Sequence, residues 1–330
     1  MLVVLAVFEV ASIALLTACA GGGTANEHRS AIAFTVNDDG FGEIWLMDSD
    51  GGNRIRLTSP GLPGTDSSGS TSPAWSPDGD HIAFVSSGEG VVEDQRLLEI
   101  YVMRADGSES RRLTTDRVPD GTPAWSPDGR RIAFAHLSEV GSGDVDVVIV
   151  VMDADGQDRV QVTRHPRTPG MVVDTHPVWS PDGSRMSFTR GTLSPSGLAQ
   201  ATIYTIDPAS GTERLVIEDA AEPAWSPDGG RIVFTSVRDR NGETCFHECG
   251  PSRELYVANA DGTGVRRLTR NEADDHSPVF APDGERIAFV SDRSNRGEHE
   301  NEIYVIELDG GRLERLTTND VWDLEPYWRR

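Results

Sequence analysis

Short apolar runs recur along the chain at intervals of about 46 to 55 residues, and turn sequences separate them. In one interval, Ile82–Phe84 is followed by a polar stretch and then by a second apolar run, Ile100–Met103. Both runs are apolar at successive positions, which is typical of strands that are buried on both faces. Ser-Pro-Asp-Gly and Ala-Asp-Gly turns border the runs, since Pro presets the backbone angle and Gly accepts conformations that other residues resist. The pattern therefore predicts repeated units of four antiparallel strands.

Five copies of one heptapeptide mark these units. Three read Pro-Ala-Trp-Ser-Pro-Asp-Gly, one has Val in place of Ala, and one reads Pro-Val-Phe-Ala-Pro-Asp-Gly; they lie at 73–79, 123–129, 177–183, 223–229 and 278–284. Each copy is predicted to form the first strand and first turn of its unit, with the aromatic residue filling the gap between neighbouring units. A four-stranded sheet cannot bury both faces alone, so the units must form a ring.

The first unit has no heptapeptide before it. Ala31–Phe34, Ile44–Asp48 and Arg54–Thr58 supply three strands, and the segment Glu325–Trp328 near the carboxyl end aligns with Glu222–Trp225. We therefore predict that the last segment completes the first unit and that closure leaves no exposed strand edge between the termini. The fold class is all-β, a six-bladed β-propeller over 31–328, with blades at about 31–58 plus 324–328, 72–114, 122–163, 176–217, 222–269 and 277–317.

These units resemble the WD-like propeller repeats of the TolB family, whose mark is the Pro-x-Trp-Ser-Pro-Asp-Gly stretch. The resemblance covers about residues 31–328. It implies a cell-envelope propeller that docks other proteins. The α/β domain that precedes the propeller in TolB is not expected here, because only the segment 20–30 separates Cys19 from the first unit.

The amino-terminal segment is apolar for about 15 residues and then reads Leu16-Thr17-Ala18-Cys19. Such a short apolar run followed by small residues is typical of an export signal. The Leu-Thr-Ala-Cys sequence resembles a lipobox, which implies cleavage before Cys19 and lipidation of its sulfur, with residues 20–30 as a flexible tether. A plain secretory signal with an incidental cysteine is the alternative. We expect an exported, membrane-anchored protein that faces the periplasm or the cell exterior.

The formal net charge of −23 argues against nucleic acid as a partner, since phosphates are repelled. The same charge favours solubility and can attract cations or basic partners. We expect a monomer that meets the membrane only through its lipid anchor and binds an envelope protein or peptide.

Turn lengths distinguish the two ends of the predicted ring. The turns at one end are short and uniform, whereas the loops between the second and third strands vary widely, which favours recognition at the second end. The residue before each inner-strand proline should surround the channel mouth there: Ser72, Thr122, His176, Glu222, Ser277 and Glu325. Acidic or imidazole side chains nearby are Asp120, Asp174, Asp274, Asp275, His276 and Asp323.

Three interpretations of this acidic mouth stay open. The polar residues can solvate a water-filled channel and cap strand starts. Alternatively, His176, Glu222 or Glu325 can bind a divalent cation, the only cofactor considered, since carboxylates with imidazole suit several metals. The third interpretation is a docking site for a basic or peptide-like partner, and it involves His176, Glu222, Glu325, Asp174, Asp274 and His276.

Cys245 and Cys249 lie in the longest loop and are the only cysteines after Cys19. In an exported protein, two close cysteines predict a disulfide that stiffens the loop. A zinc site with His247 is the alternative, although a fourth ligand is not evident.

The sequence favours a binding module over an enzyme. A prolyl oligopeptidase type needs an α/β-hydrolase domain, and no Gly-x-Ser-x-Gly elbow occurs. The remaining catalytic alternative is a metal-dependent polysaccharide lyase or hydrolase in the channel mouth, with His176, Glu222 and Asp174 as base and ligands. We therefore expect a non-catalytic, lipid-anchored propeller that binds a partner through its mouth and variable loops.

Overall fold

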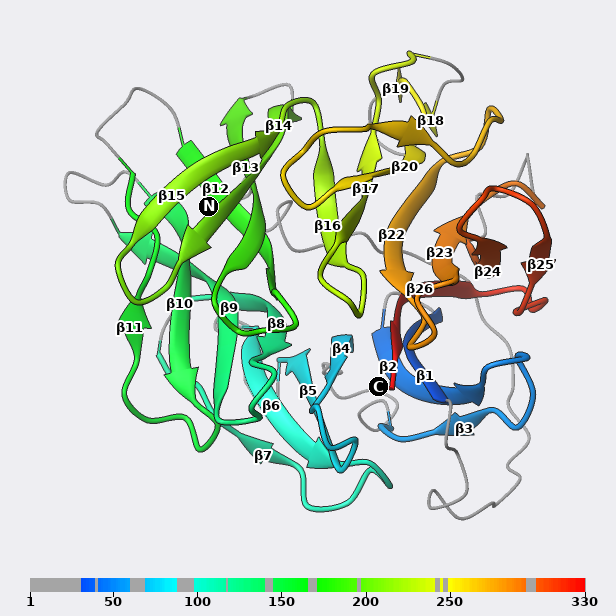
Figure 1. Ribbon diagram of the computed structural model, residues 1–330. Coiled ribbons are helices and arrows are strands. Elements are labelled where there is room, and N and C mark those ends of the chain that lie inside the picture. The colour runs from blue at the N-terminus through cyan, green and yellow to red at the C-terminus, as the bar shows by residue number, and fades with distance from the viewer. Residues whose placement is uncertain are drawn as a thin grey trace.

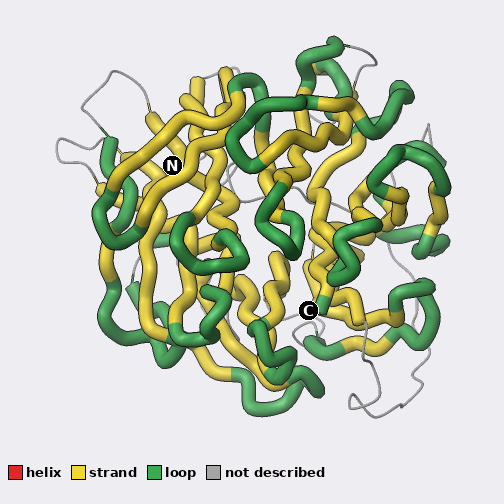
Figure 2. The backbone as a smooth tube through the Cα atoms, in the orientation of Figure 1, coloured by secondary structure: helices red, strands yellow, loops and turns green. Residues whose placement is uncertain are grey.

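The computed structural model describes residues 31–38, 41–59, 69–87, 98–116, 118–139, 145–165, 171–194, 197–240, 244–245, 249–294 and 301–329. Every regular element in these ranges is a β-strand (Figures 1 and 2). No helix in these ranges is long and apolar enough to cross a membrane. The sheets stand around a common centre in the arrangement of a β-propeller (Figure 1). Cys19, the signal segment and the tether lie outside the described residues.

Four of the sheets contain four strands each, as the repeats predict. Their orders are β26-β1-β2-β3, β4-β5-β6-β7, β16-β17-β20-β21 and β22-β23-β24-β25. The strands are β1 (Ala31–Asp38), β2 (Phe41–Asp48), β3 (Ile55–Arg56), β4 (Ser70–Trp75), β5 (His81–Ser86), β6 (Glu99–Arg104), β7 (Arg111–Arg112), β16 (Ala221–Trp225), β17 (Arg231–Ser236), β20 (Glu254–Asn259), β21 (Arg266–Arg267), β22 (Asp275–Phe280), β23 (Arg286–Ser291), β24 (Glu302–Glu307), β25 (Leu313–Arg315) and β26 (Trp322–Trp328).

The third and fourth predicted units share one eight-stranded sheet instead of forming two separate sheets. Its strands are β8 (Asp120–Trp125), β9 (Arg131–Glu139), β10 (Val145–Asp153), β11 (Val160–Gln161), β12 (Met171–Trp179), β13 (Met186–Ser194), β14 (Gly197–Asp207) and β15 (Thr212–Ile217). One parallel bridge, Val147 to Val173, joins the two halves. The cause is strand length, because β10 and β12 have nine residues each whereas β6 and β4 have six. The prediction of six separate four-stranded sheets is therefore wrong at this junction.

A two-stranded hairpin extends the region between β17 and β20. It consists of β18 (Thr244–Cys245) and β19 (Cys249–Gly250), and its register places Cys245 opposite Cys249. The disulfide between them stays a prediction, and His247 lies outside the described residues.

The heptapeptide turn forms as its composition predicts. In the first complete copy, the Gly79 N–H donates to the Ser76 carbonyl at 2.9 Å, and Gly79 has a φ of 73°. The Asp78 carboxylate accepts from the Asp80 N–H at 3.0 Å. The turn therefore requires glycine for its backbone angle.

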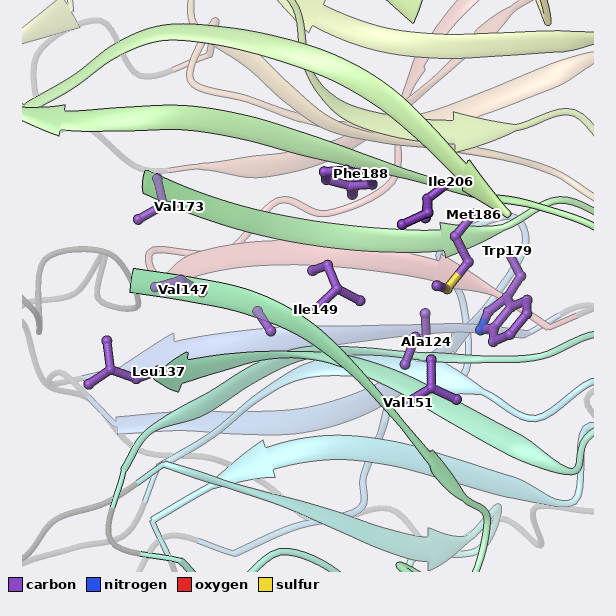
Figure 3. Close-up of a cluster of buried hydrophobic side chains, with 12 residues drawn as sticks. Ala124, Leu137, Val147, Ile149, Val151, Val173, Trp179, Met186, Phe188 and Ile206 are labelled. Atoms are coloured by element: carbon purple, nitrogen blue, oxygen red, sulfur yellow. The ribbon is translucent and has the colours of Figure 1, made fainter. Parts of the chain in front are cut away.

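The hydrophobic core lies between neighbouring sheets. One cluster joins Trp179 of β12 with Ala124 of β8 and Val151 of β10 (Figure 3). The aromatic residues of the other heptapeptides occupy equivalent places, and all but the partly buried Trp125 are at most 5% exposed. This position fills the gap between units, as predicted.

The first and last described strands pair with each other. Strand β26 is antiparallel to β1, and the register places Trp328 opposite Ile32 and Tyr327 opposite Ala33. Trp328 is 1% exposed and packs in one cluster with Phe34. Arg286 of β23 also lies over the Trp328 ring, 5.5 Å from its centre. The carboxyl-terminal segment thus supplies the inner strand of the first sheet.

Replacing Trp328 with Ala should lower the free energy of unfolding by about 3–5 kcal/mol, because a large buried side chain leaves a cavity between two sheets. Urea denaturation followed by tryptophan fluorescence measures the change. Leu313→Ala is the control, since Leu313 is 43% exposed and its loss should cost less than about 0.5 kcal/mol. Equal stability of the two variants would show that β26 does not hold the first sheet.

Candidate functional site

Each inner strand contains one β-bulge immediately before its proline. In β4, Thr71 pairs with Val85 and Ala74 with Ala83, so the inner strand has one residue more than its neighbour. The same excess occurs in β8, β12, β16, β22 and β26. The residue before the proline has a φ between 46° and 53° in every case. We call these six residues the pre-proline ring: Ser72, Thr122, His176, Glu222, Ser277 and Glu325.

The pre-proline ring surrounds a single cavity. The ring and the proline after each of its members line a space of about 150 Å³. A second cavity of about 30 Å³ shares Ala124, Val178 and Tyr327 with the first and is bordered by Trp75, Trp125 and Trp179. The second space has room for only about two water molecules. Of these two cavities, the wider, ring-lined one has room for a ligand larger than water.

Glu325 binds across the ring to the next inner strand. Its carboxylate accepts hydrogen bonds from the Ser72 N–H at 2.6 Å and the Ser72 hydroxyl at 2.8 Å, and from the Thr35 hydroxyl at 2.9 Å. The bulge frees the Ser72 N–H from the sheet ladder, so this N–H needs another acceptor. Glu325 consequently connects β26 to β4 at the mouth.

Glu222 makes the equivalent connection to β22. Its carboxylate accepts from the Ser277 N–H at 2.7 Å and from Arg253 Nη1 at 3.0 Å. Burial raises the pKa of Glu222. The Arg253 charge, followed by those of His276 and His176, lowers the pKa by more than burial raises it, so the net pKa is below its ordinary value. This carboxylate is therefore ionised and already paired.

Arg253 is the centre of a charged cluster at the mouth. It donates to Asp274 through Nε at 3.0 Å and through Nη2 at 2.5 Å, while Nη1 binds Glu222. Burial opposes ionisation of Asp274, yet Arg253 lowers its pKa to about 2. Burial and then the Arg253 charge lower the pKa of His276 to about 4, against the pull of Asp274 and Glu222. The structure thus brings together three predicted residues, Glu222, Asp274 and His276.

His176 differs from the other ring members because it is exposed. Its N–H donates to the Thr122 hydroxyl at 3.3 Å, and its Nδ1 lies 3.1 Å from the Thr175 hydroxyl. The imidazole thus remains accessible from the cavity that it lines.

Asp174, like Asp274 and His276, is not among the residues that line the cavity, whereas His176, Glu222 and Glu325 are. Asp174 is completely buried, and its carboxylate receives Arg190 Nε at 2.7 Å, Arg190 Nη2 at 2.8 Å and His165 Nε2 at 2.8 Å. Asp174 precedes the bulge of β12 and His176 lies within it, and the bulge interrupts the alternation that would otherwise put both side chains on one face of the strand. The three residues proposed for a catalytic site, His176, Glu222 and Asp174, are therefore not assembled in one place.

The nearby aspartates share one structural position, three residues before the proline. Asp120, Asp174, Asp275 and Asp323 are all completely buried. Asp275 binds Arg293 Nη2 through both of its oxygens at 2.7 Å. Asp323 accepts from Asn319 at 2.9 Å, but its Oδ1 has no partner among the described residues. This position therefore carries a buried carboxylate whose compensation differs from unit to unit.

Replacing Asp323 with Asn should stabilise the protein at pH 8, whereas the equivalent Asp174→Asn should destabilise it. Burial, and next the charge of Glu302, raise the pKa of Asp323 from 3.8 to about 7. The native state then binds more protons than the unfolded state between pH 4 and 7, so the free energy of unfolding falls as pH rises through this window and stays low above it. The Asp323→Asn variant carries a neutral amide, so its free energy of unfolding does not fall in this way. The difference is at most a few kcal/mol, at about 1.4 kcal/mol per pKa unit.

At Asp174 the sign is opposite. Burial alone raises its pKa, but hydrogen bonds from Arg190 and His165 lower it below the ordinary value. Removing its charge leaves Arg190 with a weaker partner and should cost about 3 kcal/mol at pH 8. Urea midpoints of both variants between pH 4 and 8 measure the two effects. Destabilisation by Asp323→Asn at pH 8 would contradict a raised pKa for Asp323.

Arg253→Gln should raise the pKa of His276, because the variant removes a positive charge and leaves Asp274 and Glu222 beside the imidazole. Imidazole chemical shifts recorded by NMR as a function of pH give the value, with His276→Asn used for assignment. Arg266→Gln is the matched control, since Arg266 is exposed and binds the carbonyls of Leu308 and Asp309. An unchanged His276 titration in Arg253→Gln would show that burial alone sets its pKa.

Sequence reasoning missed the arginines that organise this region. Arg253, Arg190 and Arg293 compensate the carboxylates named above, and none of them belongs to the heptapeptide. Arg190 and Arg293 follow the second-strand phenylalanines Phe188 and Phe289 and lie over their rings. That recurrence of Phe followed by Arg was a detectable signal, whereas Arg253 has no such pattern around it.

Comparisons with known proteins agree with this architecture. Residues 244–330 match the family described as TolB beta propeller domain. The Tol-Pal system protein TolB of Bordetella pertussis is 34% identical over 145 residues, which is 44% of this chain and 29% of that protein. The aligned region thus spans less than a third of that curated relative.

Two solved structures show the same fold at low identity. The crystal structure of TolB from Acinetobacter baumannii superposes with a TM-score of 0.66 at 20% identity, covering 92% of this chain and 67% of that one. An oligogalacturonate lyase from Vibrio parahaemolyticus gives a TM-score of 0.54 at 16% identity, covering 86% and 75%. At these identities the similarity indicates the fold and not the chemistry.

Proposed function

Because this chain carries a TolB-like β-propeller, we propose that it is a non-catalytic binding module of the bacterial cell envelope that docks a peptide segment of an envelope protein in its channel mouth. The observation that carries the proposal is the ring-lined cavity. Six strained residues of the pre-proline ring surround one opening, and backbone strain of this kind, which costs of the order of 1 kcal/mol per residue, concentrates at functional sites.

The lining of the cavity suits an extended peptide. Six proline rings supply apolar walls, and the exposed His176 supplies a polar group that ligands can reach. Glu222 and Glu325 are occupied by Arg253, Ser277 and Ser72, so they fix the shape of the opening. The 150 Å³ space accepts one or two side chains of a partner. The second cavity, of about 30 Å³, is too small to admit more of the partner.

The proposal includes a six-bladed ring and a lipid anchor. The ring is supported by the six equivalent bulges and by pairing between β1 and β26, with the eight-stranded sheet counted as two blades. The anchor is supported by the Leu-Thr-Ala-Cys sequence that ends at Cys19. Export to the envelope and an envelope partner are supported by the similarity to a Tol-Pal system protein. We infer that the protein acts as a monomer, without nucleic acid.

Chemical crosslinking in intact cells, followed by affinity purification and mass spectrometry, tests the proposal. The wild-type chain should crosslink to one envelope protein, and His176→Ala should reduce that product at least tenfold, because the His176 side chain lines the cavity and its hydrogen bond is with the adjacent Thr175. His81→Ala is the matched control, since His81 begins β5 after a heptapeptide turn, at the opposite end of the inner strand.

Cys19→Ser should move the protein from the membrane fraction to the soluble fraction.

Equal crosslinking by wild type, His176→Ala and His81→Ala would overturn the channel-mouth assignment. Turnover of an acidic polysaccharide by the purified wild-type chain, abolished by His176→Ala, would favour the lyase alternative instead. Membrane retention of Cys19→Ser would contradict the anchor without affecting the binding proposal.

A further inference from the structure

A second group of polar side chains lies at the junction between the sheet β4-β5-β6-β7 and strand β8. Asp116 follows β7, Asp120 begins β8, and His136 lies on β9 directly opposite Asp120. One possible ligand atom from each of the three lies within 4.8 Å of those of the other two. None of the three lines the central cavity. This group is therefore separate from the proposed docking site.

Two oxygens in this group are buried without a hydrogen-bond donor among the described residues. Asp120 Oδ1 lies 2.7 Å from His136 Nδ1, but Asp120 Oδ2 has no partner among the described residues. Asp116 Oδ2 receives Arg159 Nη1 at 2.7 Å, and its Oδ1 is buried and unpartnered in the same way. Since Asp120 is completely buried, an uncompensated carboxylate oxygen is costly at this place.

Glu99 adds a third carboxylate to the junction, and it is buried like Asp120. It is 1% exposed and begins β6, and the Asp120 N–H donates to the adjacent Leu98 carbonyl at 2.8 Å. Arg112 binds its Oε1, while its Oε2 lacks a partner within the described chain. The junction thus holds three carboxylates, and Arg159 and Arg112 each engage only one oxygen of one of them.

In the other half of the same eight-stranded sheet, the equivalent position contains a permanent cation. In β12 and β13, Asp174 lies opposite Arg190, which binds both of its oxygens at 2.7 and 2.8 Å. Asp275 of β22 receives Arg293. At the same register position in β8 and β9, Asp120 lies opposite His136. The imidazole of His136 thus occupies the position that the guanidinium of Arg190 occupies opposite Asp174. An imidazole can bind a metal ion, whereas a guanidinium supplies a permanent positive charge.

The geometry points to a divalent transition-metal ion, of the Mn²⁺ or Zn²⁺ type, held by carboxylate oxygens of Asp116 and Asp120 and an imidazole nitrogen of His136. Carboxylates combined with imidazole suit these ions, whereas Ca²⁺ takes oxygen ligands. The ion supplies the positive charge that Arg190 supplies to Asp174. It also connects the link after β7 to β8 and β9, so it joins two neighbouring units.

Titration of untagged, EDTA-treated full-length protein with Mn²⁺, followed by electron paramagnetic resonance, tests this site. Mn²⁺ is the probe because thiolates bind it poorly, which leaves Cys245 and Cys249 out of the measurement. The wild type should bind one Mn²⁺ per chain and show a higher Tm with the ion, since a ligand of the native state stabilises it. Asp116→Asn should weaken Mn²⁺ binding at least tenfold, and Ca²⁺ at equal concentration should not displace Mn²⁺.

His136→Arg provides the decisive variant, because it copies the Asp174–Arg190 pair into this unit. It should lose stoichiometric Mn²⁺ binding, have a higher metal-free Tm than the wild type, and show no further rise with Mn²⁺. Equal Mn²⁺ binding by His136→Arg and the wild type would place the ion elsewhere and overturn the assignment. Failure of the wild type to bind either Mn²⁺ or Zn²⁺ at millimolar concentration would also overturn it.

Discussion

The structure depends on burial of each sheet on both of its faces. In β5, the residues Ile82–Val85 are at most 2% exposed, and in β1 the residues Ala31–Phe34 are fully buried. A four-stranded sheet with two apolar faces is stable only between two others, so each sheet depends on packing against its neighbours. The first sheet meets this requirement only because β26, nearly 300 residues later in the chain, supplies its inner strand.

The bulges at the pre-proline ring explain why the carboxylates at the channel mouth are not free. Each bulge releases one backbone N–H from its ladder, and a released N–H needs an acceptor. Glu325 and Glu222 accept from Ser72 and Ser277 on neighbouring strands, so their charge is used to join the inner strands. Arg253 then compensates Glu222 and Asp274 together. What remains accessible for recognition is the apolar proline lining and the exposed His176.

Repetition places the same buried aspartate before four of the inner-strand prolines, but not with the same counterion. Asp174 has Arg190, Asp275 has Arg293, and Asp323 accepts from the neutral amide of Asn319. A buried carboxylate is stable when ionised only with a compensating charge. The pKa of Asp174 is accordingly lowered, whereas that of Asp323 is raised to about 7. Identical backbones therefore produce different electrostatic behaviour, and the units can acquire separate roles.

The sequence by itself determined the strands, the turns and the pairing of the two chain ends. These features depend on side chains a few positions apart, such as the apolar runs around Ile82 and the turn at Gly79, or on a repeated motif such as the segment that ends at Trp328. Only the tertiary structure decided that β10 and β12 join two units in one sheet, that Asp174 is buried against Arg190, and that Arg253 binds Glu222. Each of these depends on strand length, on a bulge or on a contact between residues about 30 positions apart, and local sequence patterns do not encode such distances.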